Sequence, residues 1–542
     1  MTFRAQTFRT KTLRIALACA AIALAPGLAH AAITTPVKTA DGLVSGVPAL
    51  EPGITVFKDI PFGAAPVGDL RWKPPQPVKR WDGVRAGDKF GNVCLQPHGV
   101  GRPNVTVDLP DFPGMSEDCL NLNVWTGAKH AGEKRPVMVW IYGGAYSEGG
   151  GSSIYNDGSR LAAKGAIVVT FNYRLGALGF LSHPELTAES PEHASGNYAL
   201  MDAITVLKWV KANIAQFGGD PDNVTIFGQS AGACMVAGLT GSPQAKGLFR
   251  RGISESGAWM GLGIAKMLPR ADAEQRTLAA EDKLGLKSLA DLRAMPAQDV
   301  LTKIRGQGMM IDGWIIPQDL SKTFAEGRQN HVDVLVGTNA NEGGFTAGFG
   351  GGPPVTAQVW KDGAPKRWGT LADAGLTAYP AASDDDAKAV STRPFTDAMA
   401  WDMRLFAKDQ AKQGDKAWLY LFAHKPPYDA GKPNLGPVHA SEVAYVWDNL
   451  EKPHLFPDGA SPALASASKA DLVLADQVSQ YWVNFARTGD PNGKDLPKWP
   501  AYGQLAPTEA MLLDDHSQAG HWLTEPQIDL YQATYDRDVG GK

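Results

Sequence analysis

The chain has 542 residues, of which 44% are hydrophobic and 20% charged, and its formal net charge is −4. This composition is ordinary for a globular protein. The weak negative charge gives no support to nucleic acid or an anionic membrane surface as a partner. Length alone suggests three or more domains.

The N-terminus has the three parts of a secretory signal peptide. A basic region with Arg4 and Arg14 precedes the apolar run 15–25, which is too short to span a bilayer. Ala29-His30-Ala31 then offers a small-residue cleavage site. We therefore expect residues 1–31 to be removed and the mature chain to be secreted or periplasmic. No other apolar run reaches 18 residues, so no membrane span is expected.

The chain contains four cysteines. Cys19 leaves with the predicted signal peptide. Cys94 and Cys119 enclose a polar segment and are natural disulfide partners in an oxidising compartment. Cys234 lies in an apolar helical segment, where a small buried residue is the simplest interpretation.

Strand and helix signals alternate along the chain. A helix is predicted where Leu200, Ile204, Leu207 and Val210 recur at helical spacing, and Gly218-Gly219 should end it. Near-continuous apolar runs favour strands buried on both faces of a parallel sheet. The strands are expected at 42–46, 54–57, 136–141, 166–171, 224–227, 332–336 and 418–422. The pattern predicts an α/β fold with a mostly parallel sheet and helices on both faces.

The pattern of two further segments, 258–330 and 345–415, predicts helices of less regular spacing, and we interpret these segments as lid-like insertions. The glycine-rich run Gly348-Phe349-Gly350-Gly351-Gly352 is a candidate hinge between such parts.

The pentapeptide Gly228-Gln229-Ser230-Ala231-Gly232 stands between a predicted strand and a predicted helix. A serine on such a sharp turn exposes its hydroxyl beside a helix N-terminus, where a nucleophile that attacks an ester carbonyl should lie. In a chain with 60 glycines a chance match is a real alternative. The motif therefore needs a base, an orienting acid and oxyanion donors from elsewhere in the chain.

The predicted strand 136–141 runs into Tyr142-Gly143-Gly144-Ala145-Tyr146. In an α/β-hydrolase this loop supplies backbone N–H groups to the oxyanion, and the residue after the nucleophile supplies another. Gly144, Ala145 and Ala231 are accordingly the predicted oxyanion hole, with an ordinary glycine-rich turn as the alternative.

The acid and the base should follow the serine in that order. Glu342 lies just after the strand at 332–336, beyond the carboxyl end where open α/β sheets place their sites. A solvated loop glutamate is the alternative. His439 lies in a loop that opens into an amphipathic helix at 443–447. By position alone five histidines are equal candidates for the base, namely His424, His439, His454, His516 and His521.

Nearly the whole mature chain resembles the type-B carboxylesterase family, which includes cholinesterases and bacterial p-nitrobenzyl-type esterases. Several ordered stretches carry the resemblance. They are Phe57-Lys58-Asp59-Ile60-Pro61-Phe62-Gly63, Gly68-Asp69-Leu70-Arg71-Trp72, the segment 116–125 around Glu117-Asp118-Cys119-Leu120, Asn172-Tyr173-Arg174-Leu175-Gly176, Phe217-Gly218-Gly219-Asp220-Pro221 and the segment 482–492.

The resemblance implies an α/β-hydrolase fold with Ser230 as nucleophile, Glu342 as acid and His439 as base. It also implies a Cys94–Cys119 disulfide, an Arg71–Glu117 ion pair, and a Ser256 hydroxyl that bonds the catalytic acid. One active site built from residues 144 to 439 favours a single catalytic domain over 32–542. The implied reaction is hydrolysis of a small-molecule ester through an acyl-enzyme intermediate, with no metal or cofactor.

Three departures from the family concern the substrate. Gln229 replaces the usual glutamate before the serine and so removes a negative charge that would attract cations. No tryptophan lies between Cys94 and Cys119, where cholinesterases carry their cation–π anchor. A choline ester is therefore disfavoured. Ala145 stands where glycine is commoner, and family members with this kind of loop tend to accept bulky alcohols, including tertiary ones.

Two alternatives remain open from sequence. A specialised esterase of a large natural ester, such as a fumonisin-type toxin or a feruloyl conjugate, would use the same triad. A basic cluster in its acyl pocket would favour a tricarboxylate substrate. An adhesion protein on the same fold, like the catalytically inactive neuroligin relatives, is the rival from another class. The sequence does not specify the oligomeric state.

Overall fold

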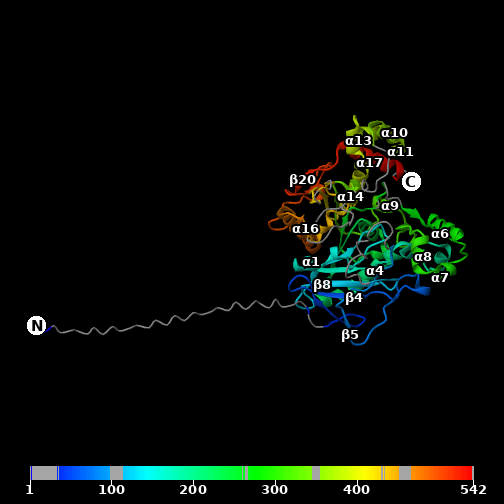
Figure 1. The fold of residues 1–542 in the computed structure, drawn as a ribbon, viewed down its shortest axis with the longest axis vertical. Coiled ribbons are helices and arrows are strands. Elements are labelled where there is room, and N and C mark those ends of the chain that lie inside the picture. The colour runs from blue at the N-terminus through cyan, green and yellow to red at the C-terminus, as the bar shows by residue number, and fades with distance from the viewer. Residues whose placement is uncertain are drawn as a thin grey trace.

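A computed structural model of the protein describes residues 36–97, 114–258, 260–262, 267–344, 355–428, 434–450 and 466–539, together with Thr2, Ile33 and Gly431. An 11-stranded sheet forms its framework, with the order β20-β19-β18-β17-β14-β13-β9-β10-β8-β4-β3 (Figure 1). The strands of this sheet are β3 (Val47–Pro48), β4 (Thr55–Pro61), β8 (Asn121–Thr126), β9 (Arg135–Ile141), β10 (Ile167–Phe171), β13 (Gly219–Gln229), β14 (Arg251–Glu255), β17 (Asp333–Asn339), β18 (Ala417–Phe422), β19 (Glu509–Leu513) and β20 (Gln518–His521).

The centre of the sheet is parallel and its edges are antiparallel. Every neighbouring pair from β10 to β19 is parallel, whereas β8, β4 and β3 at one edge and β20 at the other pair antiparallel. The residues of β10, β14 and β18 are all buried, as expected for strands that are covered on both faces. The predicted mostly parallel α/β sheet is confirmed, and the carboxyl ends of its central strands meet along one edge.

Two groups of helices pack against this sheet. In one, α5 contacts α4 and α9, and α14 contacts α9; in the other, α1 contacts α16. The helix predicted from residue 200 is α4, and Gly218 with φ of 84° ends the short helical turn that continues it. The helices of the two groups are α1 (Ser159–Ala163), α4 (Tyr198–Asn213), α5 (Ala231–Gly241), α9 (Leu320–Ala325), α14 (Arg393–Lys412), α15 (Val443–Val446) and α16 (Lys469–Thr488).

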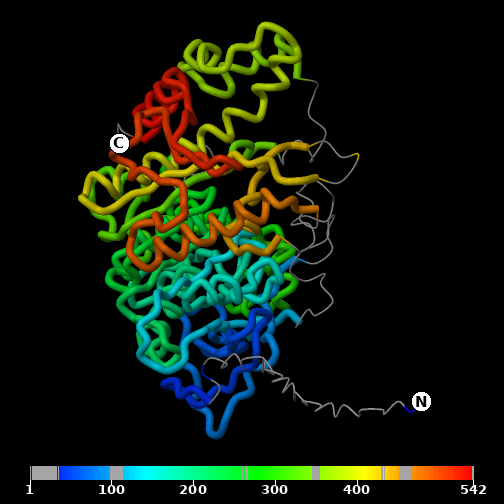
Figure 2. Tube along the Cα trace, turned by 90° about the vertical axis from the view of Figure 1, so that its left-hand side faces the viewer, coloured from blue at the N-terminus to red at the C-terminus, as the bar shows by residue number. Residues whose placement is uncertain are grey.

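The two segments interpreted as insertions are mainly helical where they are described, although the first also holds two short strands at 268–269 and 310–311. The first contains α6 (Arg270–Leu284), α7 (Leu289–Ala294) and α8 (Ala297–Lys303), and the second contains α10 (Ala357–Asp362), α11 (Ala364–Trp368), α12 (Ala372–Ala378) and α13 (Asp384–Val390). Figures 1 and 2 show α10, α11 and α13 beside α17 (Glu525–Asp538), at the end of the molecule far from β4. Their action as a lid stays a prediction. The candidate hinge Gly348–Gly352 and the predicted signal peptide, apart from Thr2, lie outside the described residues.

The remaining elements are short. They are β1 (Val37–Lys38), β2 (Leu43–Ser45), β5 (Val84–Ala86), β6 (Val93–Cys94), β7 (Met115–Ser116), β11 (Phe180–Leu181), β12 (Gly196–Asn197), β15 (Leu268–Pro269), β16 (Met310–Ile311), α2 (Gly176–Gly179) and α3 (Pro184–Glu189). None of the helices within the described part of the chain is long and apolar enough to cross a membrane.

The predicted disulfide and the predicted ion pair are both present. Cys94 and Cys119 form a disulfide with their Cα atoms 4.9 Å apart. The buried Arg71 donates to both carboxylate oxygens of Glu117, at 2.8 and 2.7 Å, a bidentate pairing that fixes direction as well as distance. The same guanidinium donates to the Met295 carbonyl at 2.8 Å and so ties the N-terminal region to the first insertion.

Candidate active site

Ser230 occupies a strained turn between the end of β13 and the start of α5. Its φ is 55°, a left-handed value that non-glycine residues rarely adopt. The turn is held by its backbone, because the Ser230 N–H donates to the Glu255 carbonyl at 2.9 Å. Strain of this kind is typical of a nucleophile elbow, which lifts the side chain out of the sheet edge.

The two glycines of the pentapeptide are required by close packing. A Cβ added at Gly232 would lie 1.9 Å from the Ile141 carbonyl oxygen, and one at Gly228 would lie 2.5 Å from the same atom. Any side chain at either position would push α5 away from β9. The sequence pattern G-x-S-x-G therefore reflects a steric need at this turn and not chance alone.

The predicted oxyanion loop follows β9 and faces the turn. Gly144, Ala145 and Tyr146 have φ of 106°, 51° and 62°, so three consecutive residues are left-handed. Within the described residues the N–H groups of Gly144 and Ala145 donate no hydrogen bond. Ala231 is the first residue of α5, so its N–H has no acceptor in the helix. These are the properties that an anion-binding cradle needs.

Glu342 and His439 come from two loops that are joined by their backbones. Asn341 forms a parallel bridge with Val438, and its N–H donates to the Pro437 carbonyl at 3.0 Å. The His439 Nδ1–H donates to Glu342 Oε2 at 2.5 Å. Glu342 is fully buried at the end of β17, so the solvated-loop alternative is wrong. The structure thus brings the predicted acid and base into direct contact.

A hydrogen-bond network surrounds the Glu342 carboxylate. The Ser256 hydroxyl donates to Glu342 Oε1 at 2.6 Å, as predicted, and the Asn339 N–H donates to the same oxygen at 2.7 Å. Burial raises the pKa of Glu342, but the charge of His439 and these hydrogen bonds lower it more, so the pKa lies below the ordinary value. Glu342 is therefore held as a carboxylate that orients His439.

A second buried carboxyl group, Glu442, lies beside this network. Its Oε2 accepts a hydrogen bond of 2.6 Å from the Asn339 side chain. Burial and the charge of Glu342 raise the pKa of Glu442 to about 7. Burial lowers the pKa of His439, but Glu342 and then Glu442 raise it more, so the pKa lies above its ordinary value. Sequence reasoning missed Glu442, although its place three residues after His439 was a usable signal.

Gln229 points its amide at the other side of the imidazole. Gln229 Nε2 lies 3.3 Å from His439 Nε2 and can donate to it. With Nδ1–H directed at Glu342, Nε2 carries the lone pair that a base uses. Gln229 therefore supports the His439 imidazole at the nitrogen opposite Glu342.

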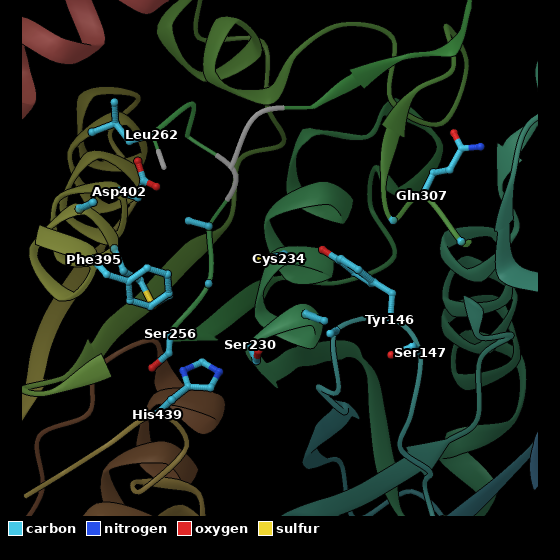
Figure 3. A pocket seen from close by; sticks show the side chains of 18 of the residues that line it. Tyr146, Ser147, Ser230, Cys234, Ser256, Leu262, Gln307, Phe395, Asp402 and His439 are labelled. Atoms are coloured by element: carbon cyan, nitrogen blue, oxygen red, sulfur yellow. The ribbon is translucent and has the colours of Figure 1, made fainter. Parts of the chain in front are cut away.

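Ser230 and His439 both line a cavity of about 910 Å³. Figure 3 shows Ser230, Ser256 and His439 at its base, with Leu262, Asp402 and Phe395 on one side and Tyr146, Ser147 and Gln307 on the other. Ala145 and Ala231 also line it. Cys234, predicted to be buried, is instead half-buried and lines the same cavity, because it lies one helical turn after Ser230.

Among the described histidines, the structure brings His439 alone to the cavity. His424 is buried and pairs with Asp471 at 2.7 Å, and His521 contacts the Thr508 hydroxyl at 2.9 Å. His516 is exposed, and His454 lies outside the described residues. The choice that sequence position left open is therefore made by tertiary structure.

Three charged residues of the cavity wall were not found from sequence. Arg305 and Arg367 line the cavity, and neither has an acidic partner within the described residues. The Arg367 guanidinium stacks 3.9 Å from the ring centre of Trp360 and 4.8 Å from that of Trp368. The third is the buried Asp402 of α14. All three come from the insertion segments, whose sequence has no motif that marks them.

Comparisons with known proteins agree with this geometry. The family model described as the Carboxylesterase family matches residues 33–531. A fumonisin B1 esterase from Sphingopyxis macrogoltabida is 38% identical over 482 residues, covering 86% of this chain and 84% of that protein. A para-nitrobenzyl esterase from Bacillus subtilis is 34% identical over 497 residues, covering 88% and 94%. A solved PNB esterase structure superposes with a TM-score of 0.75 at 30% identity, covering 92% of this chain and 99% of the other.

The fold and the cavity together define an α/β-hydrolase that cleaves esters. The chain belongs to the carboxylesterase family and is a carboxylic ester hydrolase. The relatives thus favour catalysis over the adhesion alternative.

Proposed function

We propose that this protein is a serine carboxylesterase in which Ser230, His439 and Glu342 act as nucleophile, base and orienting acid. The observation that carries the proposal is the juxtaposition at the cavity base: Ser230 on a strained turn, with His439 bonded at 2.5 Å to a buried carboxylate. Residues 32–542 are proposed as one catalytic domain, because these three residues follow strands of one sheet.

The reaction then proceeds in two halves. His439 Nε2 takes the proton of the Ser230 hydroxyl as its oxygen attacks the ester carbonyl carbon. The N–H groups of Gly144, Ala145 and Ala231 stabilise the oxyanion, and His439 returns the proton to the departing alcohol. Water then attacks the acyl-enzyme, with His439 again as base, and releases the carboxylic acid and the free serine. The carboxylate of Glu342 stabilises the imidazolium in both halves.

The direct test is hydrolysis of p-nitrophenyl acetate, butyrate and octanoate by the mature protein and by Ser230→Ala. Loss of the nucleophile should lower kcat by about 10⁶ if the triad acts as a unit. Cys234→Ala, one turn further along α5, is the matched control and should keep most of the activity. Near-normal turnover by Ser230→Ala would refute the proposed nucleophile.

For the physiological substrate we propose a large ester, as the fumonisin B1 esterase name and the cavity of about 910 Å³ both suggest. Arg305 and Arg367, without acidic partners among the described residues, support an ester that carries carboxylate groups. Fumonisin B1 is the first compound to test, beside a neutral ester of similar size. Arg367→Gln should weaken turnover of the anionic ester more than that of the neutral one, and equal effects would contradict the assignment.

The loop at Ala145 supports a proposal about the alcohol. Ala145 lines the cavity together with Ser230, and similar family members with this kind of loop tend to accept bulky alcohols. Turnover of tert-butyl acetate or linalyl acetate would support this. Rejection of both esters, with rapid turnover of linear acetates, would exclude it.

We also propose that the enzyme is exported, with residues 1–31 removed. The basic and apolar parts of this segment, its small-residue cleavage site and the Cys94–Cys119 disulfide support the proposal. N-terminal sequencing of protein from separated cell fractions is the test. A mature chain that starts at residue 1 in the cytoplasm would refute it.

A further inference from the structure

Asp402 is a buried carboxyl group in the wall of the catalytic cavity. It belongs to α14, is 4% exposed and lines the cavity. Figure 3 shows it beside Leu262 and above Phe395, on the side of the cavity away from Tyr146. It is therefore available to a group that occupies that arm of the cavity.

This carboxyl group lacks the partners that buried acids ordinarily have. Its Oδ1 atom has no hydrogen-bond partner, and Asp402 forms no ion pair within the described residues. The backbone N–H of Leu262 is the group that favours its ionised form. An unsatisfied buried polar atom is costly, so its persistence calls for an explanation.

Asp397, five residues earlier on the same helix, shows the contrast. It is also buried, but Arg393 pairs with it at 2.7 Å and the Tyr379 hydroxyl donates to it at 2.9 Å. Asp397 Oδ1 also lacks a hydrogen bond, but Arg393 gives that carboxyl group an ion pair, whereas Asp402 has none among the described residues. A ligand in the cavity is the natural partner for the part of the Asp402 side chain that the cavity leaves exposed.

The state of Asp402 indicates the chemistry of that ligand group. Burial raises the pKa of Asp402 well above its ordinary value, which favours the neutral acid over the carboxylate. A neutral acid presents one O–H donor and one carbonyl acceptor. A hydroxyl group matches both, whereas an ammonium ion would require the acid to ionise among apolar neighbours.

We propose that Asp402 is a specificity-determining residue that binds a hydroxyl group on the ester substrate. This inference rests on the proposed function, because it assigns a subsite of the same cavity. The hydroxyl lies on the part of the ester that reaches past Ser230 towards Leu262 and Phe395. Esters without it leave the Asp402 carboxyl group unpaired and are turned over more slowly.

The test compares ester pairs that differ by one hydroxyl group. The acyl series is the p-nitrophenyl esters of ω-hydroxy and plain acids of four, six and eight carbons. The alcohol series is the ω-hydroxyalkyl and plain alkyl butyrates of the same lengths. We expect kcat/KM to be about tenfold higher for the hydroxy ester at the matching length in one series, as one hydrogen bond of about 1.4 kcal/mol supplies.

Two variants separate recognition from structure. Asp402→Leu, similar in volume and apolar, should abolish the hydroxyl preference while the plain esters are still hydrolysed. Asp402→Asn keeps a donor and an acceptor and should retain most of the preference. A melting temperature for each variant reports folding, and a preference that Asn retains while Leu loses it is not expected of a merely structural residue.

Three results would overturn the inference. They are equal turnover of hydroxy and plain esters by the native enzyme in both series, a preference that Asp402→Leu leaves unchanged, and faster turnover of ω-amino esters than of ω-hydroxy esters. Failure of the proposed function has a different outcome, because then plain esters are not hydrolysed or Ser230→Ala still hydrolyses them.

Discussion

The floor and the walls of the cavity are built from different parts of the chain. The floor consists of Ser230, Glu342 and His439, held by short turns at the carboxyl ends of strands or by loops bonded to them. One wall comes from α14, which packs against the sheet, and from the C-terminal helix α17, which supplies Tyr531 and Thr534. The residues of the floor carry out the same reaction on any ester, whereas the walls determine which ester reaches them.

Glu342→Gln should have the largest effect, and it should disable the catalytic residues of the floor without changing the walls. The amide keeps the size of the side chain but cannot stabilise the His439 imidazolium, so kcat should fall by about 10⁴. Because the residues of the floor act on every ester, kcat should fall by the same factor for p-nitrophenyl acetate, butyrate and octanoate. Steady-state kinetics with the three esters measure it.

Glu255→Gln is the matched control for this variant. Glu255 is equally buried, but its side chain accepts from Trp482 Nε1 at 2.7 Å and makes no hydrogen bond to Glu342 or His439 among the described residues. The kcat of Glu255→Gln should stay within about tenfold of that of the native enzyme and so remain well above the kcat expected for Glu342→Gln. A Glu342→Gln enzyme as active as this control would contradict the proposed acid.

Phe395→Ala should have a smaller and selective effect, because it changes the wall. The ring of Phe395 lines the cavity from α14. Loss of an aromatic contact of about 1.5–3 kcal/mol should lower kcat/KM for the longest chain by about tenfold or more and leave the acetate nearly unchanged. The p-nitrophenyl acyl esters and the alkyl butyrates, each from two to eight carbons, distinguish the acyl side from the alcohol side.

Leu301→Ala provides the counterpart from α8, which lines the cavity with a different insertion. If the two walls hold different parts of the ester, the two variants should affect opposite series. An equal loss of kcat/KM for every ester in either variant would show that the walls and the floor do not act separately.

The same division explains what the sequence predicted. The floor can be predicted from local sequence motifs, since Gly228 and Gly232 are needed for steric reasons and Glu342 closely follows a buried strand. Chain position alone could not choose His439 from five histidines; the family resemblance did so, and the backbone bridge between Asn341 and Val438 brings it to Glu342. Asp402 lies on the amphipathic helix α14, where a charged residue ordinarily faces solvent, and only tertiary packing buries it in the cavity wall. Arg367 stays exposed while it lines the same cavity, so its sequence looks like that of any surface arginine.

Glu442→Gln should have the smallest effect and should act on pH dependence. His439 works as a base only when Nε2 is unprotonated, so kcat/KM falls as the pH drops through the pKa of His439. The negative charge of Glu442 raises that pKa, and its removal should move the rising limb to lower pH.

The shape of this limb should change as well, because the pKa of Glu442 is itself raised to about 7. In the native enzyme, ionisation of Glu442 in this range raises the pKa of His439 further and broadens the limb. With glutamine at position 442 the limb should follow a single titration. Glu255→Gln again serves as control, since Glu255 is not among the groups that shift the pKa of His439. A limb that stays in place or moves to higher pH in Glu442→Gln would show that Glu442 does not act on the base.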